Sequence, residues 1–249
     1  MNIKIKYPSH LQEIPLSAYQ KWLKIEENTN DDEILSYKFV QTFTGIDLKT
    51  INQMSIKDVN FLILEIKKVL EQKPQFHRRW KFNGVEFGFI PDLENMSWGE
   101  YIDAEAGLKD FENLHTAMAV LFRPITKKKK DTYEIEEYTG DDKYHEIMKS
   151  CPLNIVLGTS FFFLNLESAL LGNMAKFLKT EMSKMTETIT PSQRNSNANG
   201  NGTTVFLKSL EDELKTLTPL QSYPSIRPLR SLRIWSKKTE SNTTSISDN

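Results

Sequence analysis

The segment from Ser55 to Leu70 constrains the fold more than any other part of this sequence. Its first residues, Ser55 and Asp58, resemble the Ser-x-x-Glu box that opens many helices, with Asp in place of Glu. Apolar residues then recur three or four positions apart, which places them along one side of a helix. These residues are Val59, Leu62, Ile63, Ile66, Val69 and Leu70. The segment therefore predicts an amphipathic helix that faces a core.

Helical spacing also precedes and follows this segment. A first helix is predicted from Pro15 to Glu27, and Gly45 ends a second one that Asp31 or Asp32 caps. Their inward residues are Leu16, Tyr19, Trp22 and Leu23, and then Leu35, Phe39 and Phe43. Later helices are predicted over Ser97 to Leu108, Leu114 to Arg123, Asp142 to Lys149, Leu153 to about Lys184, and Val205 to Leu217.

Strand signals are few. Asn83-Gly84 lies between alternating apolar residues and tolerates the positive φ angles of a type I′ turn, so a hairpin is predicted at about residues 80–90, ended by Pro91. Ile3 to Tyr7 alternates with lysines and predicts a short strand. The lysine run Lys127 to Lys130 belongs to an exposed, hairpin-like excursion. The fold class is therefore mainly α, a single helical domain with a short inserted β-hairpin and a flexible C-terminal tail.

The composition changes near Thr190. From Thr190 onward the chain is rich in Asn, Gly, Ser and Thr and lacks large apolar side chains, so a flexible linker is expected over residues 189–203. The predicted organisation is a helical domain over 1–188, this linker, and a region over 204–249 with a short amphipathic helix and a basic tail.

Composition limits the class of protein. The 32 Lys and Arg residues nearly balance the 33 Asp and Glu residues, so no overall charge favours nucleic acid or an anionic membrane. Cys151 is the only cysteine, which excludes an internal disulfide and suits a reducing cytosol. The apolar run from Leu153 to Leu171 is interrupted by Asn154, Asn165 and Glu167, which predicts a buried helix and no membrane span. A soluble intracellular protein is expected.

No catalytic motif is present. The chain has no phosphate loop, nucleophile elbow, zinc spacing or dinucleotide fingerprint, so no enzymatic activity, cofactor or metal is expected. One alternative is a ferritin-like di-metal helical protein. Glu112-x-x-His115 and Asp142-x-x-His145 have the required spacing, with further carboxylates nominated from Glu100, Asp103, Glu105 and Glu167. Against it, the second pair lies on a short segment beside a charged loop.

The C-terminal region carries the candidate partner-binding residues. From Leu214 to Thr239 there are six basic residues and no acid, and the arginines recur every third residue among apolar ones. This pattern favours docking onto protein, with nucleic acid as the alternative. The residues are Leu207, Leu210 and Leu214, continued by Leu217 along the helix face, and Arg227, Arg230, Arg233 and Trp235 in the tail.

Four residues have predicted structural roles. Ser97 and Glu100 form a capping box, in which Glu100 reaches back to the Ser97 amide. Trp98, Tyr101 and Ile102 lie along the apolar side of that helix, flanked by Asp103 and Glu105. Arg123 ends the next helix and is expected to pair with Asp103 or Glu105.

The order of several motifs resembles a group of poorly characterised proteins from tailed phages of Bacteroidetes, including crAss-like and flavobacterial phages. The similarity covers roughly residues 16–180, and the lysine run at Lys127 departs from it. The motifs are Phe43 to Asp47 (FTGID), Ser55 to Ile66, Phe89-Ile-Pro91, Trp98 to Asp103, Leu114-His115, Met118 to Pro124, and the helix after Pro152 with Gly158 and Phe161 to Phe163.

The resemblance implies a function in phage assembly. Such proteins are similar to tail assembly chaperones or minor virion structural components, and they bring no catalytic residues. The implied partners are other phage structural or tail proteins, with a homo-oligomer as a further option. The implied location is the host cytoplasm or the finished virion.

Overall fold

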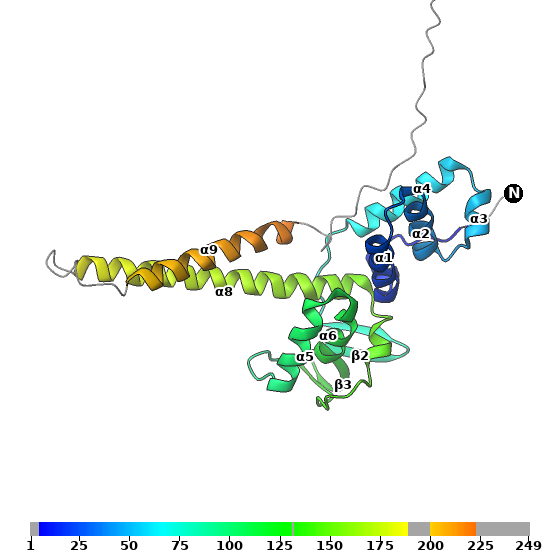
Figure 1. The fold of residues 1–249 in the computed structure, drawn as a ribbon. Helices are drawn as coiled ribbons and strands as arrows, with labels where there is room; N and C mark the ends of the chain where they lie inside the picture. Colours follow the sequence, from blue (N-terminus) through cyan, green and yellow to red (C-terminus); the bar gives the residue numbers. More distant parts are fainter. Residues whose placement is uncertain (1–4, 131, 189–199, 223–249) are drawn as a thin grey trace, which may run out of the picture.

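The structure is a computed structural model that describes residues 5–130, 132–188 and 200–222 (Figure 1). It is mostly helical, at 64%, with one small antiparallel sheet of four strands. The prediction of a mainly helical chain is confirmed. The sheet is larger than the single predicted hairpin, because a second strand pair joins it.

The N-terminal part is a cluster of helices. It contains a 3₁₀ turn, Leu11–Glu13, and the helices α1 Leu16–Asn28, α2 Asp32–Thr44, α3 Leu48–Gln53 and α4 Ile56–Leu70. Trp22 and Phe39 lie edge-to-face in the core at 4.8 Å between ring centroids, and Ile66 of α4 is fully buried in the same core. Helices α1, α2 and α4 thus bury the sides that their apolar spacing predicts.

The predicted helix ends are found where local chemistry places them. Asp31 caps α2 by accepting hydrogen bonds from two backbone amides, and Gly45 ends it in the left-handed conformation with φ 73°. Ser55 accepts from the Asp58 amide at the start of α4. Helix α3, capped by Asp47, was not predicted. The predicted strand Ile3 to Tyr7 is not found over residues 5–7, and its first two residues lie outside the described chain.

The sheet has the strand order β1-β2-β3-β4, with all pairs antiparallel. Asn83 and Gly84 have positive φ angles, 48° and 82°, and join β1 to β2 as the type I′ turn predicts. The lysine run lies in the β3–β4 hairpin, as expected. The strands are β1 Arg79–Phe82, β2 Val85–Phe89, β3 Phe122–Lys129 and β4 Thr132–Ile135.

A second group of helices packs with this sheet around a separate core (Figure 1). These are α5 Trp98–Lys109, a 3₁₀ turn Phe111–Asn113, α6 Leu114–Leu121 and α7 His145–Met148. Helix α6 ends at Leu121 and the chain continues as β3, since Pro124 disfavours helical geometry in the residue before it. The helix end near Arg123 is therefore confirmed within two residues.

Helix α5 is rotated relative to the prediction. It buries Glu100, Ala104 and Gly107. Trp98 and Tyr101 lie on its outer side, where 76% and 46% of their surfaces are exposed to solvent. A Cβ on Gly107 would lie 2.6 Å from the backbone nitrogen of Ala117. The two helices therefore approach through their smallest side chains, which turns the large apolar residues of α5 outward.

Two long helices form an arm that extends from this body (Figure 1). Helix α8, Leu153–Thr188, begins between the two cores, where Leu157 contributes to the first and Val156 to the second. Helix α9, Gly200–Ser222, lies alongside its distal part, and Lys179 pairs with Glu211 across the two at 2.6 Å. Gly200 to Thr203 of the predicted linker are thus helical, and 189–199 lie outside the described residues.

Helix α8 is only partly the buried helix that its sequence predicts. Residues 155–159 are buried, but most of the described side chains from Ser160 to Lys184 are half-buried or exposed. By length and composition alone the stretch from Leu153 to Lys184 is apolar enough to cross a membrane. That is a weak indication, because core helices of soluble proteins meet the same criterion.

Candidate functional site

A buried ion pair joins α5 to β3. The Arg123 Nη2 donates to Glu100 Oε1 at 2.5 Å, and the two side chains are only 7% and 10% exposed. Glu100 also accepts from the Ser97 amide through its other oxygen at 2.7 Å, which completes the predicted capping box. The prediction that Arg123 pairs with Asp103 or Glu105 is wrong, because the rotation of α5 turns Glu100 inward.

The two acids that were expected to pair with Arg123 have other partners. Asp103 accepts a hydrogen bond from the Tyr138 hydroxyl, and Glu105 pairs with Lys109 at 2.6 Å on the exposed side of α5. Burial and the hydrogen bond to Asp103 raise the pKa of Tyr138 to about 12. Tyr138 therefore stays protonated at neutral pH and continues to donate to Asp103.

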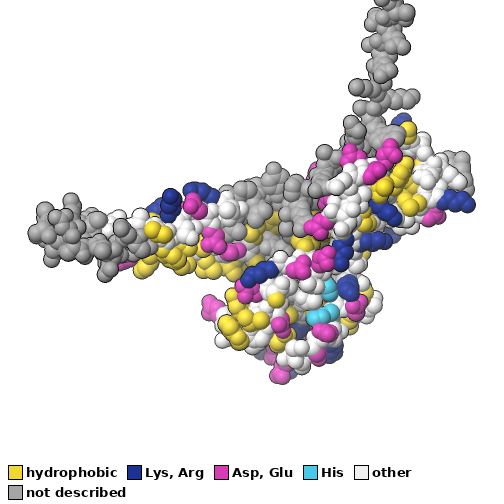
Figure 2. Space-filling view, in the orientation of Figure 1, with side chains coloured by type: hydrophobic (Ala, Val, Ile, Leu, Met, Phe, Trp, Pro, Cys, Tyr) yellow, Lys and Arg dark blue, Asp and Glu magenta, His cyan; other side chains and the backbone are white. Residues whose placement is uncertain are grey.

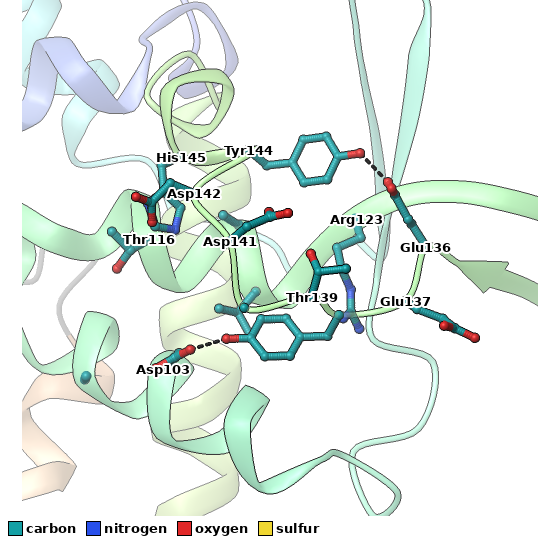
Figure 3. A pocket seen from close by; sticks show the side chains of 15 residues that line it. Asp103, Thr116, Arg123, Glu136, Glu137, Thr139, Asp141, Asp142, Tyr144 and His145 are labelled. Atoms are coloured by element: carbon teal, nitrogen blue, oxygen red, sulfur yellow. Dashed lines mark hydrogen bonds and ion pairs between the residues drawn. The ribbon is translucent and has the colours of Figure 1, made fainter.

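An acidic pocket of about 380 Å³ lies beside these residues (Figure 3). Its lining includes the apolar residues Ala106, Ala119 and Val120. Figure 3 shows the Tyr144–Glu136 hydrogen bond and, lower in the view, Asp103, which accepts a hydrogen bond from Tyr138. The acids that line the pocket are Asp103, Glu136, Glu137, Asp141 and Asp142.

Sequence reasoning did not find this pocket. Most of its acids come from the loop after β4, which follows the lysine run in the chain. The density of acids in Thr139-Gly-Asp-Asp142 was the available signal. These acids form a pocket only together with α5, where Asp103 accepts a hydrogen bond from Tyr138 of the loop, 35 residues later in the sequence.

The two histidines of the di-metal alternative do lie close together, with ring centroids 6.2 Å apart. His145 Nδ1 is 3.1 Å from Asp142, whereas Glu112 pairs with Lys24 at 2.9 Å. Burial, together with the charges of Lys149 and His145, lowers the pKa of His115. His115 thus favours its neutral form.

The remaining ligands for a metal are not assembled. Over residues 5–130, 132–188 and 200–222, no group of three or more His, Cys, Asp or Glu side chains is placed to hold a metal ion. Of the nominated carboxylates, Glu100 is held by Arg123, and Glu167 lies on the exposed side of the arm. The buried Cys151 has a pKa raised by desolvation, which keeps the thiol protonated.

The arm carries an exposed apolar stripe on α8. Figure 2 shows hydrophobic side chains gathered along the arm. Four large residues recur at helical spacing on one side of α8, and Phe177 is 65% exposed. This α8 stripe consists of Leu166, Leu170, Met174 and Phe177. On α9, Val205 and Phe206 are also exposed.

The leucines predicted to bind a partner are placed differently. Leu210 is buried at 6%, and Leu207 and Leu214 are half-buried on α9, which packs against α8. The amphipathic helix is therefore confirmed, but its apolar face contacts the chain's own arm. Arg227, Arg230, Arg233 and Trp235 lie outside the described residues.

Comparison with known proteins gives no family. No protein-family model, no curated protein and no solved structure matches this chain.

Proposed function

We propose that this chain is a non-enzymatic protein-binding component of phage morphogenesis, acting as a tail assembly chaperone or a minor virion structural protein. The ordered motifs described above support the phage setting. The α8 stripe carries the binding part of the proposal, because a continuous exposed apolar surface on a soluble protein marks an interaction site.

The form of the α8 stripe favours an elongated partner. From Leu166 to Phe177 it spans roughly 17 Å along one helix, which suits another helix lying alongside. Charged residues of both signs surround it on α8, including Glu167, Lys176 and Glu181. Such interspersed charges suit a protein partner better than the interior of a lipid bilayer.

The proposal is tested by co-purification of tagged full-length protein from infected cells. Recovery of tail or tape-measure proteins supports the chaperone, and stable presence in finished particles supports the structural subunit. Finding neither contradicts the proposal, as does recovery of the protein in the membrane fraction.

A matched pair of variants assigns the interaction to the α8 stripe. Leu170→Ser with Phe177→Ser removes two of its exposed apolar side chains and is expected to abolish recovery of the partner. The control, Ile34→Ser with Ile56→Ser, removes two similarly exposed apolar residues from α2 and α4 and should leave recovery unchanged. Equal loss in both variants would remove the α8 stripe from the proposal.

A further inference from the structure

Helix α5 presents a second exposed apolar surface, distinct from the α8 stripe. The rings of Trp98 and Tyr101 stack with centroids 5.6 Å apart and planes at 29°, and both are exposed. Ile102 beside them is 41% exposed. We call Trp98, Tyr101 and Ile102 the α5 platform. A stacked, solvent-exposed aromatic pair offers flat faces to apolar groups and to guanidinium ions.

The acidic pocket adjoins this platform. Asp103 follows Ile102 directly, and the ring of Tyr138, which donates to Asp103, lies 3.3 Å from where a Cβ on Gly99 would be. Within the described chain, neither Asp103, Glu137 nor Asp141 forms a salt bridge with Lys or Arg. The pocket therefore keeps uncompensated negative charge next to exposed aromatic rings.

Arg123, which also lines the pocket, has unsatisfied donors. Arg123 Nε and Nη1 are buried, and no acceptor among the described residues bonds to them. Buried donors without partners are costly, and a peptide carbonyl is one acceptor that would satisfy them. The Tyr138 ring lies 5.7 Å from the guanidinium carbon, so a carbonyl reaching Arg123 would displace this ring.

We propose that the α5 platform and the acidic pocket bind the chain's own segment from Ile226 to Trp235. The segment offers cations, apolar side chains and backbone carbonyls together. Its arginines recur every third residue, at 227, 230 and 233, and its apolar residues do the same at 226, 229, 232 and 235. An extended chain with three residues per turn, such as polyproline II, presents two sets with this spacing on separate faces.

Charge complementarity selects this occupant. The sequence from Leu214 to Thr239 contains six basic residues and no acid, so nothing in it repels the pocket's carboxylates. Arg side chains bind carboxylates with charge-assisted hydrogen bonds and also stack on aromatic rings. The platform supplies the rings and the pocket supplies the carboxylates. This binding does not involve the α8 stripe, so its test is independent of the test of the proposed function.

Disulfide trapping in the full-length chain tests the proposal. Ile102→Cys is combined with Ser231→Cys, and the matched control combines Ile56→Cys with Ser231→Cys, since Ile56 is at least as exposed but lies on α4. The native Cys151 is buried and stays in both. The docked segment should cross-link to position 102 at least about tenfold faster than to position 56, because docking raises its local concentration. Equal rates at the two positions would overturn the proposal.

A charge variant checks the recognition chemistry. Replacing Arg227, Arg230 and Arg233 by Gln in the Ile102→Cys/Ser231→Cys chain should reduce the rate to that of the control. Glu137→Gln with Asp141→Asn should slow it as well, and added salt should slow the parent chain. If the arginine variant loses only its affinity for DNA or RNA and cross-links at the parent rate, the segment binds nucleic acid and the proposal fails.

Discussion

Arg123 and Glu100 form an ion pair at 2.5 Å that is almost completely buried between β3 and α5. One carboxylate oxygen binds the guanidinium and the other binds the helix cap, so Glu100 links the start of α5 to the sheet. Two nitrogens of Arg123 remain without an acceptor among the described residues. The pair is thus incompletely satisfied, and a buried ion pair does not by itself imply net stabilisation of the fold.

Breaking this pair should destabilise the fold strongly. Glu100→Gln keeps a side chain that can still cap α5, but it leaves the Arg123 charge uncompensated, at a cost of about 3–5 kcal/mol in the free energy of unfolding. Urea denaturation measures it. The exposed Glu105→Gln is the control and should change stability by less than about 0.5 kcal/mol. The double variant Glu100→Gln/Arg123→Met should recover most of the loss, and no recovery would contradict this account.

The same pair predicts a pH dependence. Burial alone would raise the pKa of Glu100, but hydrogen bonds from Ser97 and the Arg123 guanidinium outweigh it and hold the pKa below 4.5. A carboxyl whose pKa is lowered in the folded state stabilises the fold at pH values above its ordinary pKa. This stabilisation is lost as the pH falls through the folded-state pKa. The difference in unfolding free energy between wild type and Glu100→Gln should therefore shrink below pH 4.5. A difference that is constant with pH would exclude this origin.

Local signals predicted much of this fold. Asp31, Ser55, Ser97 and Gly45 act at the helix ends where their chemistry places them, and the stripe of α4 is buried as expected. These features depend on residues within one or two turns of each other. Sequence spacing contains that information directly.

The remainder depended on contacts distant in sequence. The pairing of Gly88 with Arg123 extends the hairpin into a sheet, and no local pattern specifies which strands meet. The rotation of α5 follows from the close approach of Gly107 to Ala117, which outweighs the burial of Trp98. The partner of Arg123 and the acidic pocket both follow from this rotation, so neither was predictable.

Two glycines of α8 should respond oppositely to the same substitution. A Cβ on Gly158 would lie 2.2 Å from the Gln75 carbonyl oxygen, so Gly158→Ala must displace backbone and should cost about 1–3 kcal/mol or more. Gly172 has open space around its Cβ position, and Gly172→Ala should stabilise the helix by about 0.5–1 kcal/mol. Thermal unfolding of both variants measures the contrast. Equal shifts would mean that α8 does not approach residue 75.

One tyrosine, Tyr138, should ionise only at unusually high pH. Burial and the hydrogen bond to Asp103 raise the pKa of Tyr138 to about 12. In Asp103→Asn the negative charge is removed and the hydrogen bond is weakened while burial remains, so the pKa of Tyr138 should fall part of the way towards its ordinary value of 10.0. Ultraviolet titration of tyrosinate in the two proteins detects the change. An identical titration curve for the two proteins would show that Asp103 does not raise the pKa of Tyr138.

The final prediction concerns the arm. Leu210 is buried on α9, and the packing of α9 against α8 together with the Lys179–Glu211 pair holds the two helices side by side. Leu210→Ala should cost about 2–5 kcal/mol of local stability. Because the two cores lie elsewhere, this loss should appear as faster hydrogen exchange in α9 and distal α8, with exchange in α4 and β2 unchanged. Truncation after Glu187, which removes α9 and keeps the α8 stripe, should likewise leave both cores folded. A large fall in the melting temperature of the truncated chain would show instead that α9 belongs to the cooperative core.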